Sequence, residues 1–201
     1  MNQPLQFART LPAEEQARAN FYGLLARLFC APPDAVLLRE LAAAGDIDAE
    51  VDRIARAWRE LKAAAAIADP EAVRVEFDAA FVGTGKAPVT LYGGAYSVRF
   101  TNEVPLAALR GELASLGLAR RDGVGEPEDH VAALCETMRH LIVEQSHGLE
   151  EQKRFFVRWL IPMVERLCAA IEESEITDFY KHVARLAKAF FDLEQSAFEM
   201  L

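Results

Sequence analysis

The sequence lacks the features that mark membrane and secreted proteins. Although 52% of its 201 residues are hydrophobic, no apolar run reaches the roughly 18 residues that a membrane-spanning helix needs. Residues 1–18 do not combine a basic start, an apolar run and a small-residue cleavage site, so no secretory signal is predicted. Length and apolar content instead predict one globular domain over 1–201.

Cysteine is also scarce. The three cysteines, Cys30, Cys135 and Cys168, are odd in number and widely spaced, which excludes a disulfide framework and a paired-cysteine zinc site. Each lies in an apolar helical pattern, so we expect all three to be buried as small hydrophobic residues. Unpaired cysteines predict a cytoplasmic protein.

Basic residues are too few to attract polyanions. The net charge is −9 and the sequence pI is about 5.0. Long-range repulsion therefore disfavours binding to nucleic acid or to an anionic membrane, and no stable membrane insertion is expected. The same charge permits a basic peptide as a partner.

Strand signals are nearly absent, and apolar spacing of three and four residues dominates. The first helix presents an apolar face at Phe21, Leu24, Leu25, Leu28 and Phe29 and ends before Pro32. Further helices are predicted over 34–44, from Asp46 or Asp48 to 68, 69–83, 105–116, from 126 onward, around Pro162, and from Thr177 or Asp178 onward. The fold class is therefore all-α, with roughly eight to ten helices.

Residues 83–105 interrupt this pattern. The stretch is rich in glycine, proline and aromatic residues and is longer than an ordinary connection. Its aromatic residues, Tyr92, Tyr96 and Phe100, predict that the segment packs against the protein. We therefore expect an irregular central loop in an otherwise helical domain.

No local motif predicts catalysis, a metal or a cofactor. The Gly83–Lys86 stretch lacks the first glycine and the final Ser or Thr of a phosphate-binding loop, and no strand precedes it. Glu136, His140 and Glu144 share a helix face, but acid–histidine pairs at this spacing are usually solvated. The chain is therefore predicted not to be an enzyme.

The segment 126–130, Glu-Pro-Glu-Asp-His, has two interpretations. Proline in a first turn and acids beside the positive end of the helix dipole are typical of a helix start. Alternatively, carboxylates and an imidazole where a polar loop meets an apolar helix could recognise arginine side chains.

The same segment resembles the EPxDH signature of the TorD/DmsD/NarJ family of redox-enzyme maturation chaperones. Other stretches are similar to that family over about 15–198: the first helix at 20–29, the proline–aromatic–glycine loop at 88–96, and the late helices that contain Phe155, Trp159 and Tyr180. The central loop has Leu91–Tyr92 where the family has a tryptophan.

The resemblance implies a cytoplasmic chaperone that binds the twin-arginine signal peptide of a molybdopterin-dependent catalytic subunit until its cofactor is inserted. The client would be a formate dehydrogenase or a dimethylsulfoxide-reductase-like enzyme, with nitrate reductase a further candidate. The chaperone itself would need no cofactor and would be a monomer or a dimer. The peptide-contacting residues implied are Tyr22, Pro88, Tyr92, Tyr96, Glu126, Asp129 and His130.

Two other functions stay open on the sequence. One is a small-ligand or nucleotide-binding helical regulator, which would need a phosphate cradle. The other is a metal-dependent helical enzyme, which would need a ligand set assembled in space.

Overall fold

The computed structural model of the chain describes residues 11–47, 52–83, 87–96, 105–120, 125–144 and 147–201. Their α-helices are α1 Ala13–Cys30, α2 Ala35–Ala43, α3 Asp52–Ile67, α4 Pro70–Phe77, α5 Pro105–Ser115, α6 Val131–Val143, α7 Leu149–Phe155, α8 Ile161–Glu173 and α9 Phe179–Glu199. Three short irregular helices accompany them: η1 Asp78–Val82, η2 Gly93–Ala95 and η3 Phe156–Leu160. Within these residues the chain forms no β-strand, which confirms the all-α fold class.

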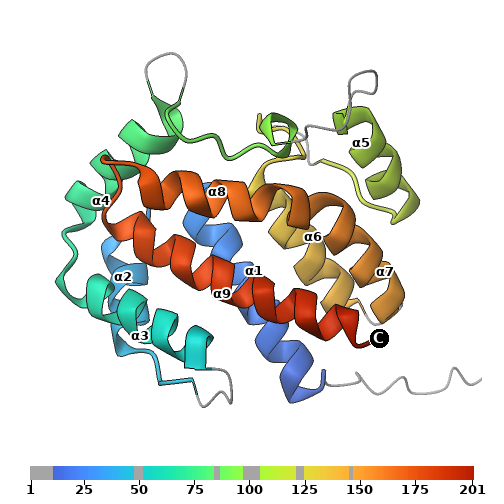
Figure 1. Cartoon of the computed structure of the whole chain (residues 1–201), viewed down its shortest axis with the longest axis horizontal. Coiled ribbons are helices and arrows are strands. Elements are labelled where there is room, and N and C mark those ends of the chain that lie inside the picture. The colour runs from blue at the N-terminus through green and yellow to red at the C-terminus, as the bar shows by residue number, and fades with distance from the viewer. Residues whose placement is uncertain (1–10, 48–51, 84–86, 97–104, 121–124, 145–146) are drawn as a thin grey trace, which may run out of the picture.

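The helices pack around α1 and α9. Helix α1 lies along α6, whereas α9 packs against α3 on one side and α8 on the other. Figure 1 shows α8 and α9 side by side in front of α1, with α2–α4 at one end of the molecule and α5 at the other. Because α1 is covered by two layers, it buries Tyr22 as well as the predicted Leu25, Leu28 and Phe29.

Several helix ends follow local sequence rules. The Asp34 side chain accepts a hydrogen bond from the Leu37 amide at 2.8 Å and so caps α2. Asp69 caps α4, which begins at Pro70, in agreement with the helix predicted from 69. Gly83 ends η1 with φ 59°, a backbone conformation that favours glycine.

Two other predicted helix starts have different outcomes. Helix α3 is described from Asp52, and residues 48–51, where its predicted start falls, lie outside the described residues; Asp46 forms an ion pair with Lys62 at 2.7 Å. Helix α9 begins at Phe179 with Asp178 as its N-cap residue, as predicted, but neither Thr177 nor Asp178 caps it through its side chain.

The cap of α9 comes from another helix. Glu76 of α4 accepts hydrogen bonds from the backbone amides of Asp178, Phe179 and Tyr180 at 2.8–3.0 Å. A carboxylate at the positive end of a helix is favourable, so this contact joins α4 to α9.

Pro162 marks an irregular turn rather than an abrupt end. The helices α7, η3 and α8 follow one another without a break. The Ile161 amide donates a hydrogen bond to the Phe156 carbonyl, five residues earlier. Because Pro162 has no amide hydrogen for the normal helical bond, the helix widens in the turn before it.

Candidate functional site

The described part of the central loop, Ala87–Tyr96, is anchored to the start of α6. The Val131 amide donates to the Leu91 carbonyl at 2.9 Å, and the Gly93 amide donates to the Asp129 carbonyl at 2.8 Å. Val89 and Leu91 are buried beneath the loop. The segment therefore packs, as its composition predicts, whereas Phe100 lies outside the described residues.

Asp129 holds this loop through its side chain as well. Its Oδ2 accepts a hydrogen bond from the Gly94 amide at 2.8 Å. A Cβ added to Gly94 would lie 3.1 Å from that same oxygen, so glycine permits the close approach. The acidic side chain and the paired glycines are thus parts of one contact.

His130 is the N-cap of α6 and is 8% exposed. Its Nδ1 accepts a hydrogen bond from the Ala132 amide at 3.1 Å, and its ring lies edge-on to Tyr92 with centroids 5.1 Å apart. Burial lowers the pKa of His130, although Glu126 and Asp129 oppose that shift. The imidazole is therefore neutral at pH 7, with its proton on Nε2.

This geometry corrects one interpretation of the segment 126–130. Residues 126–129 do not form the first turn of α6; they make a turn before it, and the helix begins at Val131. The backbone bonds of Asp129 and the cap made by His130 hold the chain outside the helix. The acids at 126–129 therefore lie at the edge of the loop rather than along the helix.

The two loop tyrosines differ in their partners. The Tyr92 hydroxyl donates to Glu126, and this hydrogen bond is the main cause that raises the pKa of Tyr92 to about 12. The Tyr96 hydroxyl donates to the Thr90 carbonyl at 2.7 Å, and burial raises its pKa to about 12. Both phenols are protonated at neutral pH and help fix the loop.

Glu128, which belongs to the same segment but was not among the predicted contact residues, binds two arginines. Arg110 of α5 donates from Nε to both carboxylate oxygens at 3.0 Å, and Arg120 Nε lies 4.0 Å from Oε1. The hydrogen bond from Arg110 is the main cause that lowers the pKa of Glu128. Its position in the acidic segment was the only sequence signal for this role.

Most of these residues border a cleft of about 1490 Å³, but Asp129, a predicted contact residue, is not part of its lining. Its walls come from the end of α1, from η1, from the central loop, from the end of α5 and from one face of α6. Pro88, Tyr92, Tyr96, Glu126, Glu128 and His130 line it. The volume exceeds that of most small-molecule pockets, and apolar lining dominates, so a peptide segment fits it better than a small polar ligand.

Two residues lie elsewhere than the sequence suggests. Tyr22 does not line the cleft; it is fully buried, and its hydroxyl donates to Glu194 at 2.9 Å. Cys30 was expected to be buried with Cys135 and Cys168, but it is exposed at the end of α1 and faces the cleft. The α1 pattern ends at Cys30, where the core no longer covers the helix.

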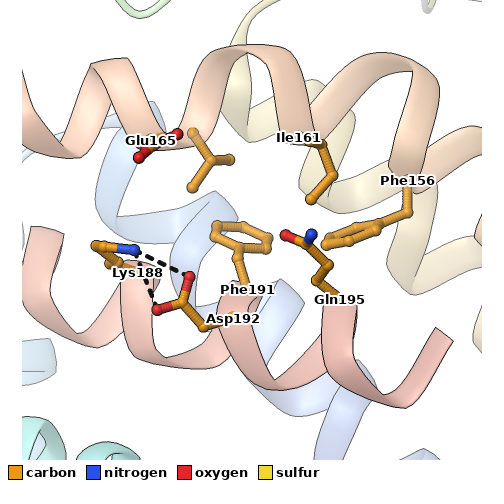
Figure 2. Close-up of a pocket in the computed structure, with 8 residues that line it drawn as sticks. Phe156, Ile161, Glu165, Lys188, Phe191, Asp192 and Gln195 are labelled. Atoms are coloured by element: carbon orange, nitrogen blue, oxygen red, sulfur yellow. Dashed lines mark hydrogen bonds and ion pairs between the residues drawn. The ribbon is translucent and has the colours of Figure 1, made fainter. Parts of the chain in front are cut away.

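A second, smaller cavity of about 170 Å³ lies between α8 and α9 (Figure 2). Phe156, Ile161 and Phe191 form its apolar part, and Lys188 at its rim already pairs with Asp192 at 3.0 Å. Its volume is below the roughly 300 Å³ at which small-molecule pockets begin, so the larger cleft is the candidate site.

The described residues offer little for the alternative functions. Among them, His, Cys, Asp and Glu side chains do not gather in threes where they could ligate a metal. Thr84, Gly85 and Lys86, which the phosphate-loop interpretation needs, lie outside the described residues. None of the described helices has both the length and the apolar character required to cross a membrane.

Comparison with known families agrees with this geometry. The model of a family described as nitrate reductase delta subunit matches residues 47–169, which include the loop, the acidic segment and α6. The chain belongs to this family. It is the NarJ/TorD-type family of chaperones that mature molybdoenzymes, which confirms the resemblance. No curated protein matches the chain.

Family membership indicates the general kind of partner. A maturation chaperone partners with subunits of a molybdoenzyme, and the family is not a catalytic one.

Proposed function

We propose that this protein binds the twin-arginine signal peptide of a molybdopterin-dependent catalytic subunit in the cleft between α1, α6 and the central loop. It would hold the apo subunit in the cytoplasm until its cofactor is inserted, and it would not itself catalyse a reaction. The observation that supports this most is the combination of carboxylates at one rim with a peptide-sized apolar cleft.

The chemistry of such a peptide matches the cleft. A twin-arginine signal has a cationic end followed by an apolar stretch. Glu126 and Glu128 bring negative charge to the rim, with Asp129 next to them in the chain, and Ala133 and Thr137 continue the lining along α6. Exposed charge pairs contribute little, so the apolar contacts would supply most of the affinity and the carboxylates the selectivity for arginine.

The proposed contact residues are Pro88, Tyr92, Tyr96, Glu126, Glu128, Asp129 and His130. Tyr22 is left out because it is enclosed in the core. We further propose a formate dehydrogenase or dimethylsulfoxide-reductase-like enzyme as the client and a single domain over 1–201, as a monomer or a dimer.

The direct test is a calorimetric titration with a synthetic twin-arginine peptide and with a version in which both arginines are glutamine. We expect the arginine peptide to bind more tightly and its advantage to shrink as salt is added, because exposed charges are screened. Equal binding of both peptides would contradict the role of the carboxylates, and no binding of either would contradict the proposal.

Asp129 allows the charge to be separated from the loop anchor. Asp129→Asn keeps an oxygen that can accept from Gly94 and removes the charge, so we expect about two- to fivefold weaker binding of the arginine peptide. Asp129→Ala removes both and should weaken binding further, with helix content by circular dichroism little changed. Gross loss of helix content would instead assign Asp129 a purely structural role.

A further inference from the structure

The acidic rim of the cleft is already occupied by arginines of the chain itself. Arg110 approaches Glu128 side-on, with Nε 3.0 Å from both carboxylate oxygens and a terminal nitrogen 3.0 Å from Oε2. Arg120 lies beside the same carboxylate at 4.0 Å. Glu128 is 13% exposed, whereas the two arginines are 50% and 41% exposed. Two solvent-facing guanidinium groups therefore cover one recessed carboxylate.

The neighbouring carboxylates differ from Glu128. Glu126 accepts from the Tyr92 hydroxyl and Asp129 from the Gly94 amide, so both bind neutral donors that fix the loop. Glu128 alone among these three has arginine partners within the described residues. A planar guanidinium with two parallel hydrogen bonds is the contact that a peptide arginine would make with it.

Helix α5 does not depend on Arg110 to stay in place. Its Leu109 is fully buried, and its Glu112 accepts hydrogen bonds from Trp159 Nε1 at 2.9 Å and from Arg158 at 3.2 Å. Arg110 can therefore leave Glu128 without α5 leaving the protein. For this exchange, only the Arg110 side chain has to rotate into solvent.

We propose that Glu128 is the arginine-binding position of the cleft and that Arg110 and Arg120 compete for it in the free chain. This inference rests on the proposed function, since it concerns the same cleft. An arginine of the incoming peptide displaces Arg110 and exchanges one charge-assisted pair for another. The internal pair lowers the affinity for every arginine-bearing peptide. It also keeps the Glu128 carboxylate paired when no peptide is bound.

The test compares wild type, Arg110→Gln, Arg120→Gln and Glu128→Gln in titrations with the two peptides described above. Loss of the competitor should tighten binding of the arginine peptide about two- to fivefold in Arg110→Gln, the range of an exposed ion pair. The effect in Arg120→Gln should be smaller because its pair is longer. Glu128→Gln should reduce the advantage of the arginine peptide over the glutamine peptide more than Asp129→Asn does, because Glu128 makes the direct pair.

Arg185→Gln is the matched control. Arg185 of α9 makes a similar two-bond pair with Glu172 of α8, with a second carboxylate, Glu60, at 3.9 Å, but it does not line the cleft. Its substitution should leave both affinities unchanged. A double variant, Arg110→Gln with Glu128→Gln, should bind like Glu128→Gln alone, because the competitor has nothing left to block.

The outcomes separate the two proposals. If wild type prefers the arginine peptide but Arg110→Gln binds it no more tightly, the competition is overturned and the proposed function stands. If Glu128→Gln keeps the full preference for arginine, Glu128 is not the arginine-binding position. If wild type shows no preference, the proposed function fails and this inference fails with it.

Discussion

Two arginine–glutamate pairs with similar hydrogen-bond geometry lie in different surroundings. Arg18 of α1 donates to both oxygens of Glu194 of α9 at 2.7 and 2.8 Å, and Glu194 is 3% exposed. The Tyr22 hydroxyl also donates to Glu194, and Arg18 has two further partners, Glu15 at 2.9 Å and Gln152 at 3.1 Å. The Arg110–Glu128 pair has bonds of 3.0 Å but stands at the rim of the cleft, half in solvent.

The comparison shows that burial, not pair geometry, separates a structural ion pair from an exchangeable one. Removing Glu194 from the buried pair takes away an acceptor that is 3% exposed, and water does not replace it beside the enclosed Tyr22 hydroxyl. At the rim, water replaces a lost partner at little cost. The same two residue types therefore hold the core together in one place and can exchange partners in the other.

The largest expected effect is on the buried pair. Glu194→Ala removes the two shortest hydrogen bonds of Arg18, which keeps Glu15 and Gln152 as partners, and leaves the buried Tyr22 hydroxyl without an acceptor. We therefore expect a loss of about 2–3 kcal/mol in the free energy of unfolding. Denaturant unfolding followed by circular dichroism measures it. A loss below about 1 kcal/mol would show that the cluster is no more important than a surface pair.

An intermediate effect is expected at His130, and it depends on pH. Burial lowers its pKa in the folded chain, so below about pH 6.5, the ordinary value, the unfolded chain binds a proton that the folded chain does not. Stability therefore falls as the pH falls through this window. The loss, about 1 kcal/mol, corresponds to the cap that a protonated Nδ1 can no longer make.

His130→Asn is the comparison for that effect. Asparagine caps helices well and does not titrate. The wild type should therefore lose unfolding free energy relative to the variant as the pH is lowered from 7.5 to about 5.5. A difference that stays constant over this range would exclude titration of His130 as the cause.

The smallest effect on stability is expected at the rim. Arg110→Gln removes the exposed partner of Glu128, and the unfolding midpoint at neutral pH should not change measurably, although peptide binding tightens. A clear drop in the unfolding midpoint would show that the Arg110–Glu128 pair stabilises the fold as a buried pair does, and would contradict its assignment as exchangeable.

Much of the fold could be predicted from local sequence. The cap Asp69, the proline at the start of α4 and the glycine stop at Gly83 act through neighbours within a few residues, so the sequence predicts them directly. The all-α class follows from apolar periodicity in the same way. The cap of α9 could not be found, because Glu76 lies 102 residues before Asp178.

The candidate site was predictable only in part. The segment 126–130 and the loop tyrosines could be singled out, and the structure brings them together at one cleft. Their roles could not be divided from the sequence, since only the fold shows that Asp129 anchors Gly94 while Glu128 binds arginine. Tyr22 was assigned to the site by resemblance, but its side chain is buried where α1 packs against α9.

The sequence by itself determined which segments are helical, where several of them begin and end, and that an acidic segment precedes an apolar helix. These properties depend on neighbours along the chain. Only the tertiary structure decided which carboxylates lie in the core, which lie at the cleft and which arginines meet them. Burial and long-range pairing depend on how the helices pack, and no short stretch of sequence contains that information.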